Sequence, residues 1–379
     1  MTVIFHTNAG APVLAGDMLI SVPGPVAYTD LRLPSYPNGI AVPSDVVPGH
    51  LPILMRRKVF IVNDHLAVGV AGSVFHAPNF VSDLFREFRD RSEFMRDELT
   101  GFFERYGSSE DSQETLEQTG ALVLAKATDW QGSLTKGLLN ERKVVTRRFG
   151  RAIAIGTGAD SVIEQIQRLD NDTEWGSTQP PDGADQFPEF GTLAHNLILL
   201  GHLYWKEFTS RANVFDAWGG AYDLVYQDSN GRFRYLDEYT IVLRLLDMDE
   251  LDKGIQLSNV VKYERRAEVS LMAMMNNGKL DFFGAKDLTS SGGPISVTIG
   301  DLSMNSKVNM SIIGVGKGNR YMLPLIQIDG LDPTDEGRQT VFMDFDDEGR
   351  LRVFFNAEHD KWLEEQATSY FEKYAHRWA

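Results

Sequence analysis

Residues 2–17 read Thr2-Val-Ile-Phe-His-Thr-Asn-Ala-Gly-Ala-Pro-Val-Leu-Ala-Gly-Asp17. Two β-rich apolar runs, 3–5 and 13–19, flank the turn-forming sequence 8–10, a pattern typical of a β-hairpin. A second hairpin is predicted from Lys58-Val-Phe-Ile-Val and residues 66–72, which are joined by Asn63-Asp-His. Its apolar content suits a sheet covered on both faces. The chain therefore begins with paired strands.

The rest of the chain alternates between helical and strand patterns. Apolar residues recur at helical spacing over 79–106, and further helices are predicted from Gly156-Thr-Gly to about 169, over 192–210 and over 360–374. Strands are predicted over 121–127, 144–148, 152–155, 222–227, 233–235, 268–275, 280–283, 295–299, 308–315, 341–345 and 350–355. Residues 170–190 are polar and predict a loop. This order predicts an α+β fold with helices flanking sheets, rather than a Rossmann alternation.

Two segments divide the chain. Residues 20–52 hold seven of the 15 prolines, a density that predicts a long ordered loop or arm and excludes helix and sheet interior. Its role is open between a surface insertion and a segment that covers a site or contacts a partner. From about residue 250 strands dominate, so we expect a domain over 1–249 and a β-rich extension over 250–379 that ends in a helix.

Composition excludes several classes of function. The 379 residues carry a formal charge of −16, which disfavours nucleic acid as a partner. Zero cysteines exclude disulfides and thiolate chemistry and are compatible with a reducing cytosol. No basic leader or apolar run of about 20 residues occurs, so we expect a cytoplasmic protein without a membrane partner. His195 and His202 are seven apart on one predicted helix, but packed histidines explain them better than metal ligands; we expect no metal and no cofactor.

The N-terminus carries the sharpest chemical feature. Thr2 is small enough to permit removal of Met1, which would leave a threonine with a free α-amine. A threonine hydroxyl needs a nearby base to become a nucleophile, and an α-amine with a pKa of roughly 7.7–8.0 is such a base. A threonine at position 2 is nevertheless common by chance.

The surrounding segments make the pattern more specific. Thr2 at the head of a strand, Val13-Leu-Ala-Gly-Asp17, the strand that begins at Lys58, and Val70-Ala-Gly72 resemble the opening of proteasome β subunits and bacterial HslV-type peptidases. Ala154-Ile-Gly-Thr-Gly158 and Asp216-Ala-Trp-Gly-Gly220 resemble later segments of that family, in family order over residues 2 to about 247. The resemblance implies a four-layer αββα sandwich of the N-terminal-nucleophile hydrolases.

It also implies a role for each matched residue. Thr2 would be the nucleophile and its α-amine the base. Lys58 would place a positive charge beside the hydroxyl, and Asp17 would pair with Lys58. The N–H of Gly72 would face the developing oxyanion. Thr157 and Asp216 would orient the Thr2 amine.

Each matched residue also has a structural role open to it. Asp17 could cap a bulge, Lys58 could be a solvated edge lysine, Thr157 could cap its helix, and Asp216 could cap a turn. The chain departs from the family at two matched places. The stretch from Thr2 to Asp17 is one residue short, so either the first turn is tighter or Met1 occupies the nucleophile's place. Gly219 replaces a family serine.

Three functions follow from the resemblance. The first is a self-assembling threonine peptidase that acts on peptides or unfolded protein within a homo-oligomeric ring, with an ATP-dependent unfoldase as an optional partner. The second is a catalytically silent assembly subunit. The third is an amidohydrolase of the same chemistry that acts on a small molecule.

Overall fold

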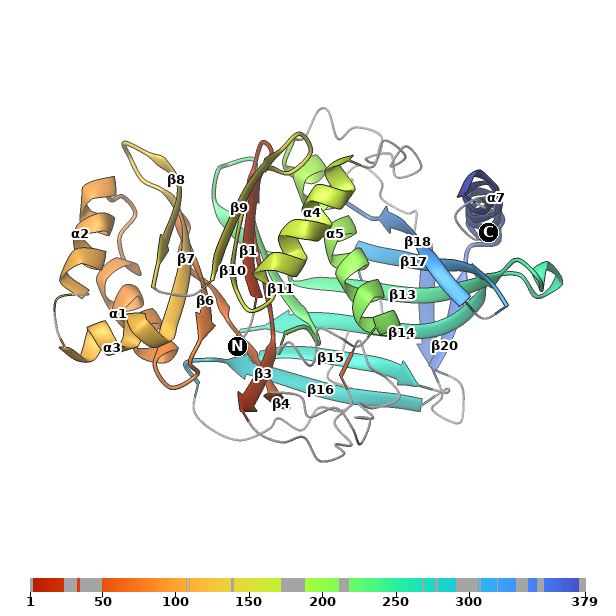
Figure 1. The fold of residues 1–379 in the computed structure, drawn as a ribbon, viewed down its shortest axis with the longest axis horizontal. Coiled ribbons are helices and arrows are strands. Elements are labelled where there is room, and N and C mark those ends of the chain that lie inside the picture. Colours follow the sequence, from red (N-terminus) through yellow and green to blue (C-terminus); the bar gives the residue numbers. More distant parts are fainter. Residues whose placement is uncertain are drawn as a thin grey trace.

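Figure 1 shows the computed structural model of the chain. It describes residues 3–23, 33–34, 50–106, 108, 110–137, 140–171, 188–210, 218–267, 269–276, 279–290, 306, 308–318, 320–331, 340–345 and 351–374. Helices and antiparallel strands both contribute, which confirms the α+β class. The predicted strand 295–299 and nearly all of the predicted loop 170–190 lie outside the described residues.

The N-terminal hairpin lies at the centre of a six-stranded sheet. The strand order is β12-β11-β2-β1-β10-β9. Its strands are β1 (Val3–Asn8), β2 (Pro12–Asp17), β9 (Glu141–Thr146), β10 (Gly150–Gly156), β11 (Tyr222–Gln227) and β12 (Phe233–Tyr235). Ile4 lies opposite Gly16 on one side and Ile155 on the other. The predicted first hairpin is therefore confirmed.

A four-stranded sheet packs against one face of the six-stranded sheet. Its order is β5-β6-β7-β8, formed by β5 (Val59–Asn63), β6 (Leu66–Gly72), β7 (Thr119–Lys126) and β8 (Gln131–Lys136). β5 and β6 form the predicted second hairpin. Ile4 and Leu14 from the first sheet share a buried cluster with Val59 and Leu122 from the second. Burial of these aliphatic side chains holds the two sheets together.

Helices cover the outer face of the four-stranded sheet. They are α1 (Ala77–Phe88), α2 (Arg96–Tyr106) and α3 (Glu110–Gln118), and they lie at one end of the molecule in Figure 1. The single helix predicted over 79–106 is wrong, because it is broken between 88 and 96. The Asn63 side chain donates to the carbonyl oxygens of Phe88 and Arg91, at 2.7 and 3.1 Å, and so caps the end of α1.

Two further helices cover the other face of the six-stranded sheet. α4 (Ala159–Asn171) and α5 (Pro188–Ser210) share a buried cluster with residues of β1, β2, β10 and β11. The order across this part of the molecule is therefore α1–α3, the four-stranded sheet, the six-stranded sheet, and α4 with α5 (Figure 1). Within the described residues, no helix is long and apolar enough to cross a membrane.

The third sheet joins both predicted domains. Its order is β18-β17-β13-β14-β15-β16-β4-β3. Its strands are β3 (Leu19–Pro23), β4 (His50–Arg57), β13 (Glu238–Asp247), β14 (Gln256–Arg266), β15 (Val269–Asn276), β16 (Lys279–Asp287), β17 (Val308–Lys317) and β18 (Arg320–Asp329). β13 pairs with both β14 and β17, so hydrogen bonding is continuous across residue 250.

The proline-rich segment begins and ends in this sheet. β3 and β4 pair from Leu19–Met55 to Pro23–His50, so the predicted loop over 20–52 is wrong at both ends. Pro23 lies on the edge strand β3, and β4 pairs with β16 only at Arg56 and Arg57, so Pro52 lies outside that second ladder. Within the segment, Leu33 is fully buried.

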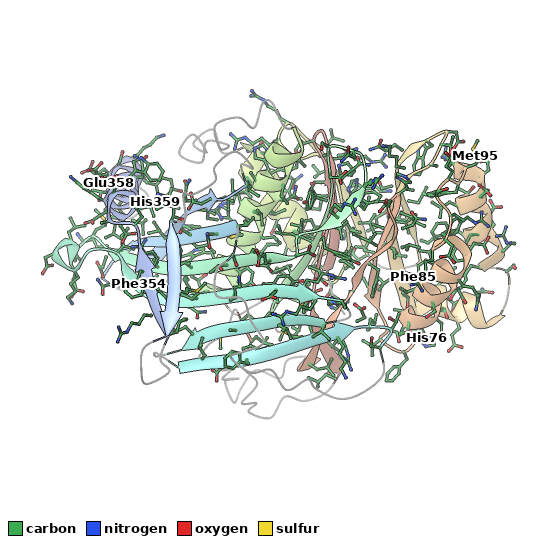
Figure 2. All side chains as sticks on the ribbon, turned by 180° about the vertical axis from the view of Figure 1, so that it is seen from behind. His76, Phe85, Met95, Phe354, Glu358 and His359 are labelled. Carbon is green, nitrogen blue, oxygen red and sulfur yellow. The ribbon has the colours of Figure 1, made fainter. Side chains whose placement is uncertain are left out.

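The last elements form a small layer on the far end of the third sheet. β19 (Val341–Phe345) and β20 (Leu351–Phe355) form the predicted hairpin, and α7 (Ala357–Tyr374) follows. The buried Arg244 of β13 forms a bidentate ion pair with Asp360 of α7, in which Nη1 and Nη2 lie 2.6 and 2.9 Å from the two carboxylate oxygens. Figure 2 shows Phe354, Glu358 and His359 at the opposite end of the molecule from His76 and Met95.

Candidate active site

Asp17 joins three parts of the chain at the end of β2. Its carboxylate is fully buried. Oδ1 accepts the backbone N–H of Val3 at 2.9 Å and the Lys58 ammonium at 3.1 Å, and Oδ2 accepts the N–H of Gly219 at 3.0 Å. These bonds offset the cost of burying the carboxylate. Asp17 therefore fixes the start of β1, Lys58 and the segment before β11 relative to one another.

Lys58 is a buried lysine between β4 and β5. Its side chain is only 3 % exposed, so the reading as a solvated edge lysine is wrong. Nζ also donates to the Leu19 carbonyl oxygen at 2.6 Å. Burial lowers the pKa of Lys58, and the neighbouring Asp17 carboxylate opposes that shift. A lowered pKa reduces the free energy needed to form a neutral amine at this position.

Gly72 ends β6, the strand next to Lys58. Val70 donates its N–H to the Lys58 carbonyl oxygen at 3.0 Å, whereas Ser73 donates toward β7, to Gln118, at 2.9 Å. Because N–H directions alternate along a strand, the N–H of Gly72 faces the same side as that of Val70. It therefore faces the end of β5 at which Lys58 lies. The φ of Gly72 is 106°, a value that favours glycine.

Thr157 lies in the turn between β10 and α4. Val3 pairs with Gly156, so Thr157 is one residue beyond the end of the β1–β10 ladder. Its side chain is exposed. α4 begins at Ala159, so Gly158 rather than Thr157 directly precedes the helix. The position is beside the N-terminal end of β1.

Glu207 of α5 was missed by the sequence reasoning. Its fully buried carboxylate accepts the N–H of Gly220 at 2.9 Å and the hydroxyl of Tyr222. Asp17 and Glu207 thus hold the N–H groups of consecutive residues, 219 and 220. Nothing local in the sequence separates Glu207 from a solvated helical glutamate, because its partners come from a segment after the helix.

Glu207 also explains why residue 219 is glycine. A Cβ at Gly219 would lie 2.7 Å from the Glu207 carboxyl carbon, and its φ of 115° disfavours any side chain. A serine at this position would collide with Glu207. Contact with the buried glutamate therefore explains why glycine stands at 219, where the family that the segment resembles has serine.

Two predicted site residues, Thr2 and Asp216, lie outside the described residues. Their described neighbours in the chain are Val3, which donates to Asp17, and Trp218, which is fully buried. The structure thus brings together Asp17, Lys58 and Gly219, with Gly72 on the strand that pairs beside Lys58 and Thr157 at the end of the strand adjoining β1. The two histidines are separate from this site: His195 of α5 contacts the ring of Phe149 with a centroid distance of 6.0 Å.

The geometry suits chemistry at the N-terminal end of β1. A buried ammonium and a buried carboxylate lie at the N–H of Val3, where the described part of β1 begins. Within the described ranges, no group of three or more His, Asp or Glu side chains is arranged to hold a metal ion. No family model matches the chain, and none of the curated proteins matches it significantly.

Proposed function

We propose that this chain is an N-terminal-nucleophile hydrolase with the αββα sandwich, a threonine peptidase whose nucleophile is Thr2 after removal of Met1. One observation carries the proposal. The N–H of Val3 and the ammonium of the buried Lys58 share one oxygen of Asp17, at 2.9 and 3.1 Å. The Val3 nitrogen forms the peptide bond to Thr2, so the charge pair holds the first described atom after the proposed nucleophile.

The proposed reaction is amide hydrolysis through an ester. The Thr2 hydroxyl oxygen adds to the carbonyl carbon of the substrate while its proton moves to the Thr2 α-amine. Lys58 stabilises the negative charge that develops on the Thr2 oxygen as its proton leaves, and Asp17 holds Lys58 in place. The carbon–nitrogen bond then breaks, and the leaving amine takes the proton. Water hydrolyses the resulting ester, releasing a carboxylic acid and restoring the hydroxyl.

The remaining residues support this chemistry. The N–H of Gly72 donates to the oxyanion of the tetrahedral intermediate, where one donor is worth roughly 2.7–4 kcal/mol. Thr157 and Asp216 orient the α-amine. Glu207 holds the segment that follows Asp216. The resemblance alone supports the further proposals that the substrate is peptide or unfolded protein, that the chain forms a closed ring in the cytoplasm, and that an unfoldase delivers substrate.

The register of β1 favours a second candidate, the catalytically silent assembly subunit. Val3 and Phe5 face α4 and α5, whereas Ile4 faces the four-stranded sheet. The β1–β2 pairing is regular from Ile4–Gly16 to Asn8–Pro12, and its continuation sets Asp17 opposite Val3. Asp17 and Val3 therefore lie on the same face of the sheet, and the stretch from Thr2 to Asp17 is one residue shorter than in the family that it resembles. That missing residue favours the reading in which Met1 occupies the nucleophile's place.

Hydrolysis by Thr2 variants tests the proposal. The wild-type protein is expected to cleave unfolded casein or short fluorogenic peptides, and Thr2→Ala is expected to abolish cleavage while leaving the circular dichroism spectrum unchanged. Thr2→Ser, which keeps a hydroxyl, is the matched control and should retain activity. Equal activity of Thr2→Ala and wild type would refute the mechanism. Folded wild-type protein inactive toward peptides and simple amides would favour the silent subunit.

A further inference from the structure

A cavity of about 390 Å³ lies between α4 and α5, next to β18. Its volume falls in the range of small-molecule sites, about 300–1,000 Å³. The polar side chains that line it include Ser161, Glu164, Gln165, Arg168, His202 and Lys206. None of these belongs to the candidate active site. The hydrolase mechanism therefore leaves this cavity without a role.

Gln165 provides the first evidence for a ligand. The residue is 8 % exposed, and its Nε2 is buried without a hydrogen-bond partner among the residues that the structure describes. A buried amide donor without a partner is unfavourable, and native proteins rarely leave one unsatisfied. Gln165 lines the cavity, so rotation of its terminal amide would bring Nε2 to an acceptor atom placed there. The missing partner is thus a hydrogen-bond acceptor.

The charges around the cavity point to the same kind of ligand. Arg168 of α4 and Lys206 of α5 are cations, and Glu164 is the acidic residue among the lining side chains. Lys206 Nζ donates to Ser161 Oγ at 3.3 Å, which holds the ammonium against α4. Burial and the nearby Arg168 charge lower the pKa of His202 to about 3. His202 is therefore neutral at physiological pH, and the lining keeps one net positive charge.

We propose that this cavity binds a small organic anion, a carboxylate or a phosphate monoester, through Gln165, Arg168 and Lys206. The amide donor and the two cations supply hydrogen bonds that match the oxygens of either group. A cationic cavity in a chain whose formal charge is −16 is a local feature rather than a consequence of composition. The proposal does not depend on the hydrolase function.

Calorimetric titration tests the proposal with two probes, inorganic phosphate and succinate, at constant ionic strength against potassium chloride. Saturable binding of at least one probe is expected. Binding of phosphate alone assigns a phosphate monoester, succinate alone assigns a carboxylate, and both assign a general oxyanion site. Absence of saturable binding for both probes would overturn the proposal.

Variants locate the binding. Arg168→Gln is expected to weaken it by about tenfold or more, because a charge-assisted hydrogen bond is lost. Gln165→Glu should weaken it further by placing a carboxylate against the anion. Arg86→Gln is the matched control, since Arg86 lies on α1 and its side chain is 77 % exposed. An equal loss in Arg86→Gln and Arg168→Gln would refute a specific site. Thr2→Ala should bind the same probe with the affinity of the wild type, whether or not the chain hydrolyses peptides.

Discussion

Replacement of Lys58 by methionine tests whether the buried ion pair also holds the fold. Methionine keeps an unbranched side chain and removes the ammonium. Asp17, which is fully buried, would keep its bonds from Val3 and Gly219 but lose its charged partner. Removing one member of a buried pair typically costs about 3–5 kcal/mol, because the remaining charge is uncompensated. The loss is large against a typical unfolding free energy of about 5–15 kcal/mol.

The expected loss of stability differs from what the sequence alone suggests. If Lys58 were only catalytic, Lys58→Ala would abolish turnover and leave folding intact. The 3 % exposure of Lys58 instead predicts that turnover and stability fall together. Both outcomes can be measured on the same protein sample.

Urea unfolding followed by circular dichroism measures the effect. Lys143→Met is the matched control; Lys143 is 48 % exposed and paired with Glu141, so its loss should cost about 0–1 kcal/mol. The double variant Asp17→Asn/Lys58→Met should be more stable than the two single losses added together, by about 0.5–3 kcal/mol. A Lys58→Met protein within about 0.5 kcal/mol of the wild type would show that the buried ion pair does not hold the fold, since that is a typical surface effect.

The pH dependence of the same experiment has a defined sign. Burial sets the pKa of Lys58 in the folded state below its ordinary value of 10.5. Between these two pKa values, Lys58 holds its proton in the unfolded chain but not in the folded one. The unfolding free energy therefore rises with pH over that range. The stability of the wild type relative to Lys58→Met should therefore increase from the folded pKa up to about pH 10.5. A decrease over that window would contradict the assigned burial.

Two further predictions concern buried contacts, and a third concerns the ring that the resemblance implies. Gly219→Ala should destabilise the protein by about 1–3 kcal/mol more than Gly220→Ala in urea unfolding, because only a Cβ at 219 meets Glu207; equal losses would argue against that contact. Leu33→Ala should cost about 2–5 kcal/mol of unfolding free energy, because this residue of the proline-rich segment is fully buried; a surface-like loss would show that the segment is not anchored there. Light scattering should find a large homo-oligomer, and a monomer at micromolar concentration would count against the proposed ring.

The sequence predicted α4, α5 and α7 and most of the strands, but it missed β8, β13, β14 and β18. Alternating apolar runs flanked by turn residues located both N-terminal hairpins, because turn chemistry and strand pattern are local. The helix over 79–106 was predicted as continuous, because its apolar spacing carries no sign of the break. That break depends on Asn63, which is distant in sequence and caps α1 through its side chain. β3 and β4 were missed because they lie at the ends of the proline-rich segment, whose composition predicts a loop.

The candidate site was predictable only where a matched segment existed. The Asp17–Lys58 contact was implied by resemblance, and the structure places the two groups 3.1 Å apart. Glu207 had no such signal. Its significance depends on Gly220 and Tyr222, which reach it only after the chain leaves α5 and enters β11. Buried charge clusters of this kind arise from tertiary contacts, which composition and periodicity do not encode.

Intact-mass spectrometry of the purified protein, with sequencing of its first residues, tests the central claim most directly. A nucleophile with its own α-amine as base exists only if the chain starts at Thr2. We expect a mass lower than that of the full chain by one methionine, with threonine as the first residue. A homogeneous protein that retains Met1 would contradict the proposed hydrolase and leave the silent subunit as the better account.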